Sequence, residues 1–179
     1  MKIAFLFPGQ GAQTVGMGKD LYDKYDEIKE VYKKASEISG KDILDITFNS
    51  TMEELSKTEN TQLAIATMSL GILKVLEEKG VQPEIAVGLS LGEYPALVTG
   101  GYLSFEDAIK LLKYRSYYME HEVEPGNYSM AAIIGLDSKI IEDVCKEIAE
   151  TGKFITPANY NYSGQTVISG DEEAIDIAI

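Results

Sequence analysis

The chain has 179 residues, of which 45% are hydrophobic, and a formal net charge of −13 at pH 7. A chain of this length can bury a core as one domain or as two small ones. The acidic balance argues against nucleic-acid binding, because a phosphate backbone attracts a basic surface.

Other global features suggest a cytoplasmic protein. No run of about 18 apolar residues is present, so we expect no membrane span. The N-terminus lacks the pattern of a secretory signal. The single cysteine, Cys145, cannot form an internal disulfide, which suits a reducing compartment. Cys145 lies in an amphipathic segment with Val144 and Ile148, and we expect it to be a buried structural thiol.

The N-terminal residues predict a buried strand followed by a glycine-rich loop. Lys2–Phe7 is mostly apolar, and the next residues read Pro8-Gly-Gln-Gly-Ala-Gln13. The glycines on either side of Gln10 let the backbone approach another group closely and turn its N–H groups outward. The loop lacks the Lys-Ser/Thr of a Walker A motif and the third glycine of a dinucleotide fingerprint. A plain strand–helix loop is the alternative, and composition alone leaves it open.

Helical patterns follow this loop. The spacing of apolar residues and the glycines at 40 and 80 predict where helices end. Thr51 and Glu54 have the spacing of a capping box, which predicts a short helix there. The predicted helices span 15–25, 28–39 and 62–79, and Asp45–Asn49 is too short to assign.

The segment Ile85–Glu93 has the order of a nucleophile elbow: a short apolar strand, the turn Gly88-Leu-Ser-Leu-Gly92, and a helix to about Val98. A serine whose hydroxyl stands clear of the backbone sits on a strained turn, so small residues are needed two positions on either side. The helix that follows supplies a backbone N–H and a positive dipole end where an oxyanion would form. The pattern predicts Ser90 as a nucleophile. For so short a motif, a strand–helix turn that happens to contain serine is the alternative.

The second half of the chain changes its pattern. A helix is predicted from Ser104, its N-cap, to His121, after a break at Gly100-Gly101. Pro125-Gly-Asn127 marks the best internal boundary, dividing the chain into 1–125 and 126–179. Beyond it we predict strand, helix, strand, strand and helix, which is the order of a ferredoxin-like unit without its last strand. These elements span 129–135, 138–150, 154–159 and 166–169, with the last helix starting at Asp171.

Together these motifs resemble a known family. Phe7–Met17, Gly88–Tyr94, Met130–Gly135 and Pro157–Asn161 occur in the order found in malonyl-CoA:acyl-carrier-protein transacylases of type II fatty-acid synthesis and in the acyltransferase domains of polyketide synthases. The resemblance covers the whole chain. It implies an α/β fold, in which a ferredoxin-like small subdomain is inserted into an α/β-hydrolase-like large subdomain with a parallel sheet. The residues 1–125 would then belong to the large subdomain and 126–179 to an incomplete small one.

The resemblance also implies roles for individual residues. Ser90 would attack the malonyl thioester of coenzyme A and pass the acyl group to the pantetheine thiol of acyl carrier protein. The backbone N–H groups of Gln10 and Leu91 match the family's oxyanion hole. Asn159 matches a position near the active-site cleft, although it can also be a plain turn residue. Coenzyme A is thus a substrate, and neither a permanently bound cofactor nor a metal is expected.

Arg115 can also be assessed from its own surroundings. On the predicted helix its neighbours three and four residues away are apolar: Leu111, Leu112, Tyr118 and Met119. A guanidinium in such a stripe should be paired or should face a ligand, because an unpaired buried charge is costly. Extension of the side chain to solvent, or an internal ion pair, is the alternative. In the family the matching arginine holds the free carboxylate of the malonyl group, a task that suits its planar fork.

The expected general base is missing from this sequence. The only histidine, His121, lies about 120° round the predicted helix from Arg115, and we expect it to be a solvated helix-end residue. The family's catalytic histidine follows the ferredoxin-like insert. The last residues, from Asp171 to Ile179, open a helix without a cap, and we interpret this as truncation. Leu89 replaces a histidine found before the serine in many relatives, which affects the pocket and leaves the nucleophile unchanged.

Two functional hypotheses remain. One is an acyltransferase, complete or active only with a C-terminal part. The other is a catalytically incomplete fragment that binds acyl-CoA or a partner without turnover. A serine esterase is weaker, because no His-Gly-Gly-Gly oxyanion motif is present. The expected partners are malonyl-CoA and acyl carrier protein, with neither nucleic acid nor membrane. Apolar surface left by the missing part would favour self-association.

Overall fold

The computed structural model describes residues 2–122 and 127–179, which form two units, Met1–Glu120 and His121–Ile179. Each unit is described by itself. The boundary predicted at Pro125-Gly126 falls outside the described residues. Unit 1 contains a parallel sheet and unit 2 an antiparallel one, both accompanied by helices, so the predicted α/β class is confirmed.

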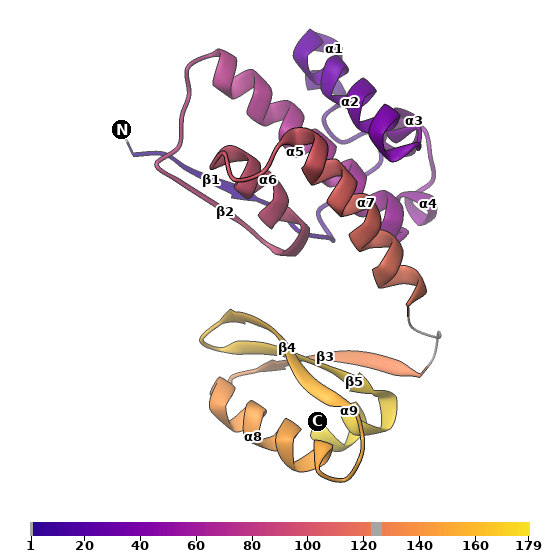
Figure 1. Ribbon diagram of the computed structural model, residues 1–179, viewed down its shortest axis with the longest axis vertical. Helices are drawn as coiled ribbons and strands as arrows, with labels where there is room; N and C mark the ends of the chain where they lie inside the picture. Colours follow the sequence, from indigo (N-terminus) through magenta and orange to yellow (C-terminus); the bar gives the residue numbers. More distant parts are fainter. Residues whose placement is uncertain (1, 123–126) are drawn as a thin grey trace. The chain divides into compact units, whose positions relative to one another are not determined.

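The sheet of unit 1 joins two strands that are far apart in the sequence. Strand β1 (Ala4–Phe7) pairs in parallel with β2 (Ile85–Gly88), with Phe7 opposite Gly88. Figure 1 shows the two strands side by side, with α6 following β2. A parallel pair needs a crossover connection, and here five helices provide it. As a result, the loop after β1 and the turn after β2 come to the same end of the sheet.

The first helix of the crossover begins later than predicted. The helix expected over 15–25 forms only as α1 (Lys19–Lys24), because Gly16 and Gly18 adopt left-handed backbone angles of φ 82° and 70°. A helix cannot pass through such residues. The remaining crossover helices are α2 (Asp26–Ser39), α3 (Ile43–Phe48), α4 (Met52–Ser56) and α5 (Thr58–Glu78).

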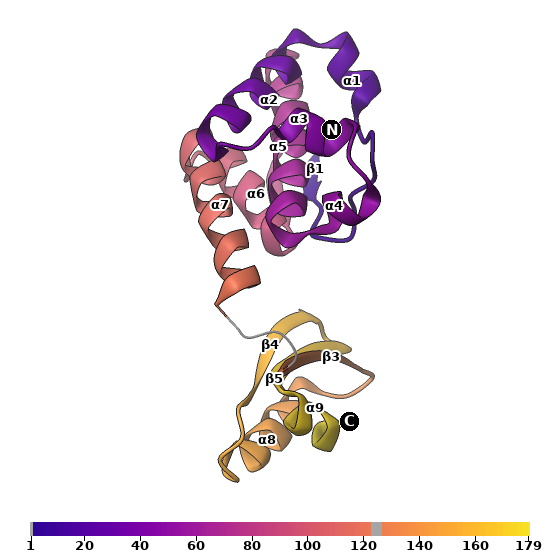
Figure 2. The ribbon, with the colours of Figure 1, turned by 90° about the vertical axis from the view of Figure 1, so that its right-hand side faces the viewer.

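Helix α5 forms the centre of unit 1. Its side chains are buried nearly all round, including polar ones such as Asn60, Thr61 and Gln62. Figures 1 and 2 show α2 and α3 packed along it. The core also takes in Leu91, just after β2, and Leu112 of α7 (Phe105–His121). The apolar spacing in the sequence predicts one buried face, whereas α5 is buried on nearly all sides.

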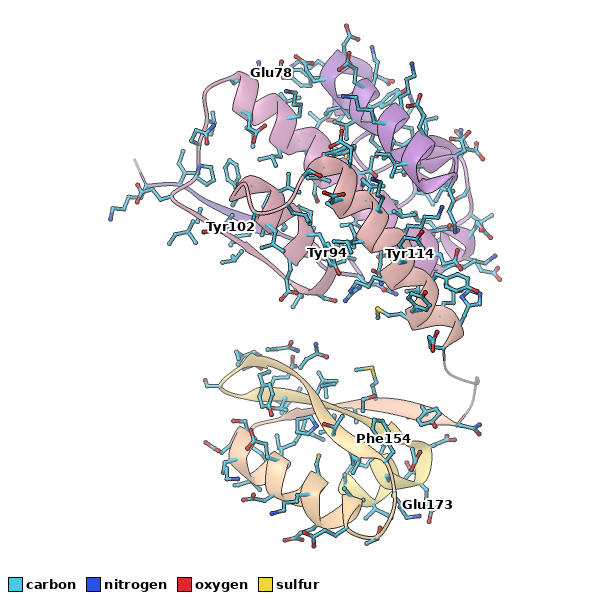
Figure 3. The ribbon with its side chains drawn as sticks, in the orientation of Figure 1. Glu78, Tyr94, Tyr102, Tyr114, Phe154 and Glu173 are labelled. Carbon is cyan, nitrogen blue, oxygen red and sulfur yellow. The ribbon has the colours of Figure 1, made fainter. Side chains whose placement is uncertain are left out.

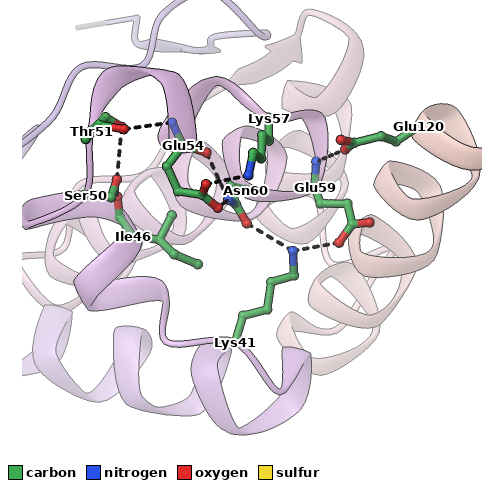
Figure 4. Close-up of polar contacts among 9 residues, drawn as sticks. All are labelled: Lys41, Ile46, Ser50, Thr51, Glu54, Lys57, Glu59, Asn60 and Glu120. Atoms are coloured by element: carbon green, nitrogen blue, oxygen red, sulfur yellow. Dashed lines mark hydrogen bonds and ion pairs between the residues drawn. The ribbon is translucent and has the colours of Figure 1, made fainter. Parts of the chain in front are cut away.

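A polar network anchors the N-terminal end of α5 (Figure 4). Lys41 Nζ lies 2.6 Å from Glu59 Oε2 and 3.0 Å from Asn60 Oδ1. The Asn60 side chain donates in turn to Glu54. The Glu59 backbone N–H, which has no acceptor within its own helix, donates to Glu120 Oε2 at 3.1 Å. A carboxylate at this position is favourable for the helix dipole, and the contact ties the end of α7 to the start of α5.

The second face of the unit 1 sheet is exposed. Leu6, Ile85 and Val87 retain 75%, 61% and 48% of their accessible surface. Parallel sheets are normally covered on both faces, so this apolar face is unusual for a folded unit. It agrees with the apolar surface expected from the sequence, whereas self-association through it stays a prediction.

The turn after β2 packs directly against the end of β1. A Cβ atom at Gly88 would lie 2.0 Å from the Gly92 carbonyl carbon, and one at Gly92 would lie 2.4 Å from the Phe7 carbonyl oxygen. Leu89 N–H also donates to Phe7 O at 3.1 Å. A side chain at 88 would collide with backbone inside the turn, and one at 92 would separate the turn from β1, so both glycines are required by close approach.

Unit 2 has the element order predicted from the sequence. Strands β3 (Tyr128–Ile134), β4 (Ile155–Tyr162) and β5 (Gln165–Asp171) form an antiparallel sheet in the order β3-β5-β4. Helices α8 (Ser138–Ala149) and α9 (Glu172–Ala178) lie on the same face of that sheet (Figure 1). Ile168 is buried between sheet and helices at 1% exposure. The arrangement is that of a ferredoxin-like unit with one strand fewer.

The packing around Gly88 leads to a stability prediction. We expect Gly88→Ala to lower the free energy of unfolding of unit 1 by about 3 kcal/mol or more, because the new methyl group overlaps rigid backbone. Gly80→Ala is the control in the same unit, since Gly80 has a left-handed φ of 71° and open space around it. It should cost only about 1–2 kcal/mol of backbone strain. Urea unfolding of both variants measures the difference, and equal costs would contradict the close-approach argument.

Candidate active site

Ser90 occupies the sharp turn predicted from the sequence. It follows β2 and starts a short 3-10 turn, Ser90–Gly92, that runs into α6 (Glu93–Thr99). Among the described residues it is the only one other than glycine with a positive φ, at 54°. Such a conformation is unfavourable for a side chain and persists only where the surrounding structure imposes it. The Gly88 and Gly92 contacts impose it here. The serine is half-buried and lies just beyond the end of β2.

Arg115 reaches Ser90 from α7. Its Nη2 group donates to Ser90 Oγ at 2.8 Å, and its Nη1 group donates to Gln62 Oε1 at 2.5 Å. The guanidinium is thus held between a serine after β2 and a glutamine of α5. Gln62 is fully buried, so its carboxamide is a fixed anchor. This arrangement leaves the remaining N–H groups of the fork for another acceptor.

The surroundings of Arg115 differ in part from the expected apolar stripe. Leu112 is buried, but Leu111, Tyr118 and Met119 are 46%, 51% and 57% exposed. Only one side of α7 packs on the core. Tyr114 of α7, labelled in Figure 3, is 57% exposed. Arg115 is half-buried at the boundary between these two sides. It contacts Gln62 and Ser90, in place of the extension to solvent or the internal ion pair considered from the sequence.

Gln10 and Leu91 supply backbone N–H groups on either side of the elbow. Leu91 follows Ser90 directly, and its apolar side chain is buried at 1% exposure. Gly9 packs against the residue before the serine, since a Cβ there would lie 2.9 Å from Leu89 O. Within the described residues, the N–H groups of Gln10 and Leu91 donate to no protein acceptor. Their use as an oxyanion hole stays a prediction.

Asn159 belongs to unit 2. A β-bulge falls between Pro157 and Asn159, so that Asn159 pairs with Val167, which in turn pairs with Ala132. Paired residues share a face, and this is the face opposite the helix-covered one that buries Ile168. The bulge therefore turns the Asn159 side chain to the open face of the sheet. It is exposed there, and its role near a cleft stays a prediction.

The other candidate residues have structural explanations. His121 is exposed at the end of α7. Cys145 is buried on α8 at 2% exposure, and burial raises the pKa of its thiol. A thiol that stays protonated is a poor nucleophile, in agreement with the structural role expected for it.

Gln62 is the site residue that the sequence reading missed. It was predicted only as the first residue of a long helix, whereas the structure makes it the partner of Arg115. The available signal was the polar triplet Asn60-Thr61-Gln62 at the start of an otherwise apolar helix. Three polar residues there are all buried, and buried polar groups need partners.

No group of three or more His, Cys, Asp or Glu side chains in 2–122 and 127–179 lies close enough to hold a metal ion. No helix in the same ranges has the length and apolar character needed to cross a membrane.

Comparison with known proteins places this site in a family. The model of the acyl transferase domain matches residues 4–179. A malonyl CoA-acyl carrier protein transacylase of Bacillus subtilis (strain 168) is 41% identical over 177 residues, covering 99% of this chain and 56% of the relative. The chain thus spans little more than half the length of the curated relatives it matches.

Solved structures agree. An acyl carrier protein S-malonyltransferase from Vibrio cholerae matches with a TM-score of 0.91 and 40% identity, over 99% of this chain and 58% of that one. A malonyl-transacylase solved in complex with a holo acyl-carrier protein of a type II polyketide synthase matches with a TM-score of 0.88, 40% identity and the same two coverages. The strand–elbow–helix geometry, the family match and these likenesses together show that the chain belongs to the acyl transferase domain family.

Proposed function

We propose that this chain carries the nucleophile and the carboxylate clamp for transfer of a malonyl group from coenzyme A to the pantetheine thiol of acyl carrier protein. The observation that supports this most directly is the 2.8 Å contact between Arg115 Nη2 and Ser90 Oγ. A cation thus lies beside Ser90, the proposed nucleophile, in a chain whose relatives are named for malonyl transfer.

The chemistry of malonyl-CoA explains why these two groups must be close. Its free carboxylate and its thioester carbon are separated by a single methylene group. A site that attacks the thioester carbon with Ser90 must therefore hold the carboxylate next to that serine. Arg115, anchored on Gln62 and touching Ser90, is in the required position. A guanidinium binds a carboxylate through two parallel hydrogen bonds, which also orients it.

The reaction then has two half-steps. Ser90 Oγ bonds to the thioester carbon, the C–S bond breaks, and the serine proton ends on the departing coenzyme A thiol. In the second half, the pantetheine sulfur bonds to the ester carbon, the C–Oγ bond breaks, and the serine regains a proton. The N–H groups of Gln10 and Leu91 would stabilise the oxyanion in both halves. Asn159 is proposed as a substrate-binding residue by its match to the family motif.

An incomplete site is the second candidate function, and one observation favours it. Among the described residues, the hydrogen-bond partner of Ser90 Oγ is the Arg115 guanidinium. A guanidinium only donates hydrogen bonds and cannot take the serine proton. An alcohol without a base is a weak nucleophile. A chain spanning 56% of its relative would then bind acyl-CoA or a partner and turn over slowly or not at all.

The partner surface is a separate part of the proposal. A neighbouring structure contains an acyl-carrier protein, and we extend that partner to this chain. Carrier proteins are acidic, as is this chain with its net charge of −13, so like charges repel over most of the surface. A basic docking patch that overcomes this repulsion must be local or lie outside this chain. Coenzyme A enters and leaves as part of the substrate and product, in the cytoplasm.

The acyl-enzyme is the first test. We expect malonyl-CoA to add one malonyl group to Ser90, detected by intact mass and peptide mapping, and Ser90→Ala to abolish it. A downstream segment taken from a full-length relative should accelerate the reaction by about 10²-fold or more if it supplies a general base. Adduct formation by the chain alone would reject the inactive-fragment hypothesis. Absence of adduct with and without the segment, in a folded protein, would reject the transferase.

The clamp is the second test. Arg115→Ala should slow labelling by malonyl-CoA by about 10- to 100-fold, which is the value of a charge-assisted hydrogen bond. Labelling by acetyl-CoA, which has no free carboxylate, should not slow. Arg115→Lys is the matched control, because it keeps the charge without the fork and should retain part of the preference. Equal slowing with both thioesters would mean that Arg115 supports Ser90 without recognising the carboxylate.

A further inference from the structure

The second glutamine of the N-terminal loop has contacts that the proposed function does not use. Gln13 is 8% exposed. Its Oε1 atom accepts the Gly11 backbone N–H at 2.8 Å, and its Nε2 group donates to Ser56 Oγ at 3.4 Å. The side chain thus connects the glycine-rich loop after β1 to the last residue of α4.

The loop has little else to hold its tip. Gly11 adopts φ 107° with open space around it, and Gln10 is exposed. The one backbone hydrogen bond across the tip within the described residues, from Ala12 N–H to Gly9 O, is long at 3.4 Å. Glycine has the largest conformational freedom of any residue. A short hydrogen bond from a buried side chain is therefore the main restraint on the Gln10–Gly11 peptide.

The two peptide planes around Gln10 are then held from opposite ends. Gly9 packs against the Leu89 backbone, at 2.9 Å for a Cβ atom placed on it. Gly11 is held by Gln13. Because each peptide group is planar, holding Gly9 on one side and the Gly11 N–H on the other restricts the rotation of the peptide that carries the Gln10 N–H. Gly11 N–H is occupied by this bond, whereas Gln10 N–H is not.

We propose that Gln13 is a positioning residue for the oxyanion loop: it holds the Gly11 N–H so that the Gln10 N–H stays free and fixed beside the elbow. The inference rests on the proposed function for its catalytic consequence only. An oxyanion donor contributes only if its direction is set before the reaction. Gln13 would therefore affect the transition state and leave substrate binding unchanged, although it touches neither substrate nor serine.

Amide hydrogen exchange tests the restraint without any need for activity. Nuclear magnetic resonance of the whole chain should show the Gly11 amide protected in the wild type. In Gln13→Met, a variant of similar size without an acceptor, its exchange should accelerate at least about 10-fold, the loss expected for one hydrogen bond. Gln13→Glu keeps an acceptor and should retain protection. Ser56→Ala, the matched control, removes the distant 3.4 Å contact and should change Gly11 exchange less than Gln13→Met.

The catalytic consequence is read from acylation of Ser90 by malonyl-CoA. Gln13→Met should lower the maximal acylation rate about 10-fold, less than complete removal of an oxyanion donor, with the half-saturating concentration unchanged. An equal Gly11 exchange rate in Gln13→Met and wild type would overturn the proposal, as would a normal maximal acylation rate. If the wild type is protected at Gly11 but forms no adduct with or without the downstream segment, the restraint stands and the transferase function fails. If Gln13→Met does not fold, the Gln13→Glu and wild-type Gly11 amides decide, and an unprotected amide in both overturns it.

Discussion

The whole site depends on one steric constraint, the close approach of backbone around the elbow: Gly92 packs against the end of β1 and Gly88 packs against Gly92, so neither has room for a Cβ atom. This contact forces Ser90 into a left-handed conformation. It also brings the loop after β1 to the same end of the sheet, since Phe7 pairs with Gly88. The same backbone contacts thus set the conformation of Ser90 and bring the neighbouring loop close to it. The strain at Ser90 is maintained by the surrounding packing.

Helix α5 supplies the second requirement, a rigid partner for Arg115. Its N-terminal end is held by Lys41 and by the Glu120 carboxylate, and Gln62 lies within one turn of these contacts. The same helix thereby orders α7 and the guanidinium that α7 carries. A buried amide with fixed partners can orient a charged side chain, whereas a solvated one cannot. Stability and site geometry therefore share one set of contacts.

The accuracy of the sequence reading followed the range of the interactions involved. The elbow and the Ser104 cap depend on residues within a few positions, and both were predicted; Asp107 N–H donates to Ser104 Oγ at 3.0 Å. The predicted start of the first helix was wrong because glycine permits left-handed as well as right-handed backbone, and the sequence does not determine which conformation it adopts. The Arg115 stripe was partly wrong because helical spacing identifies a face but does not reveal which parts of it another helix covers.

The sequence by itself determined the α/β class, the order of elements in both units apart from α3, and Ser90 as the residue on a strained turn, since these follow from local pattern and glycine placement. Only the tertiary structure decided that Gln62 anchors Arg115, that Arg115 touches Ser90, and that Gln13 holds Gly11. The first two pairs are 53 and 25 residues apart, and their meeting depends on how the helices pack. Gln13 is close to Gly11 in sequence, but its orientation requires burial against α4. Distance along the chain and the packing of side chains carry information that no local pattern contains.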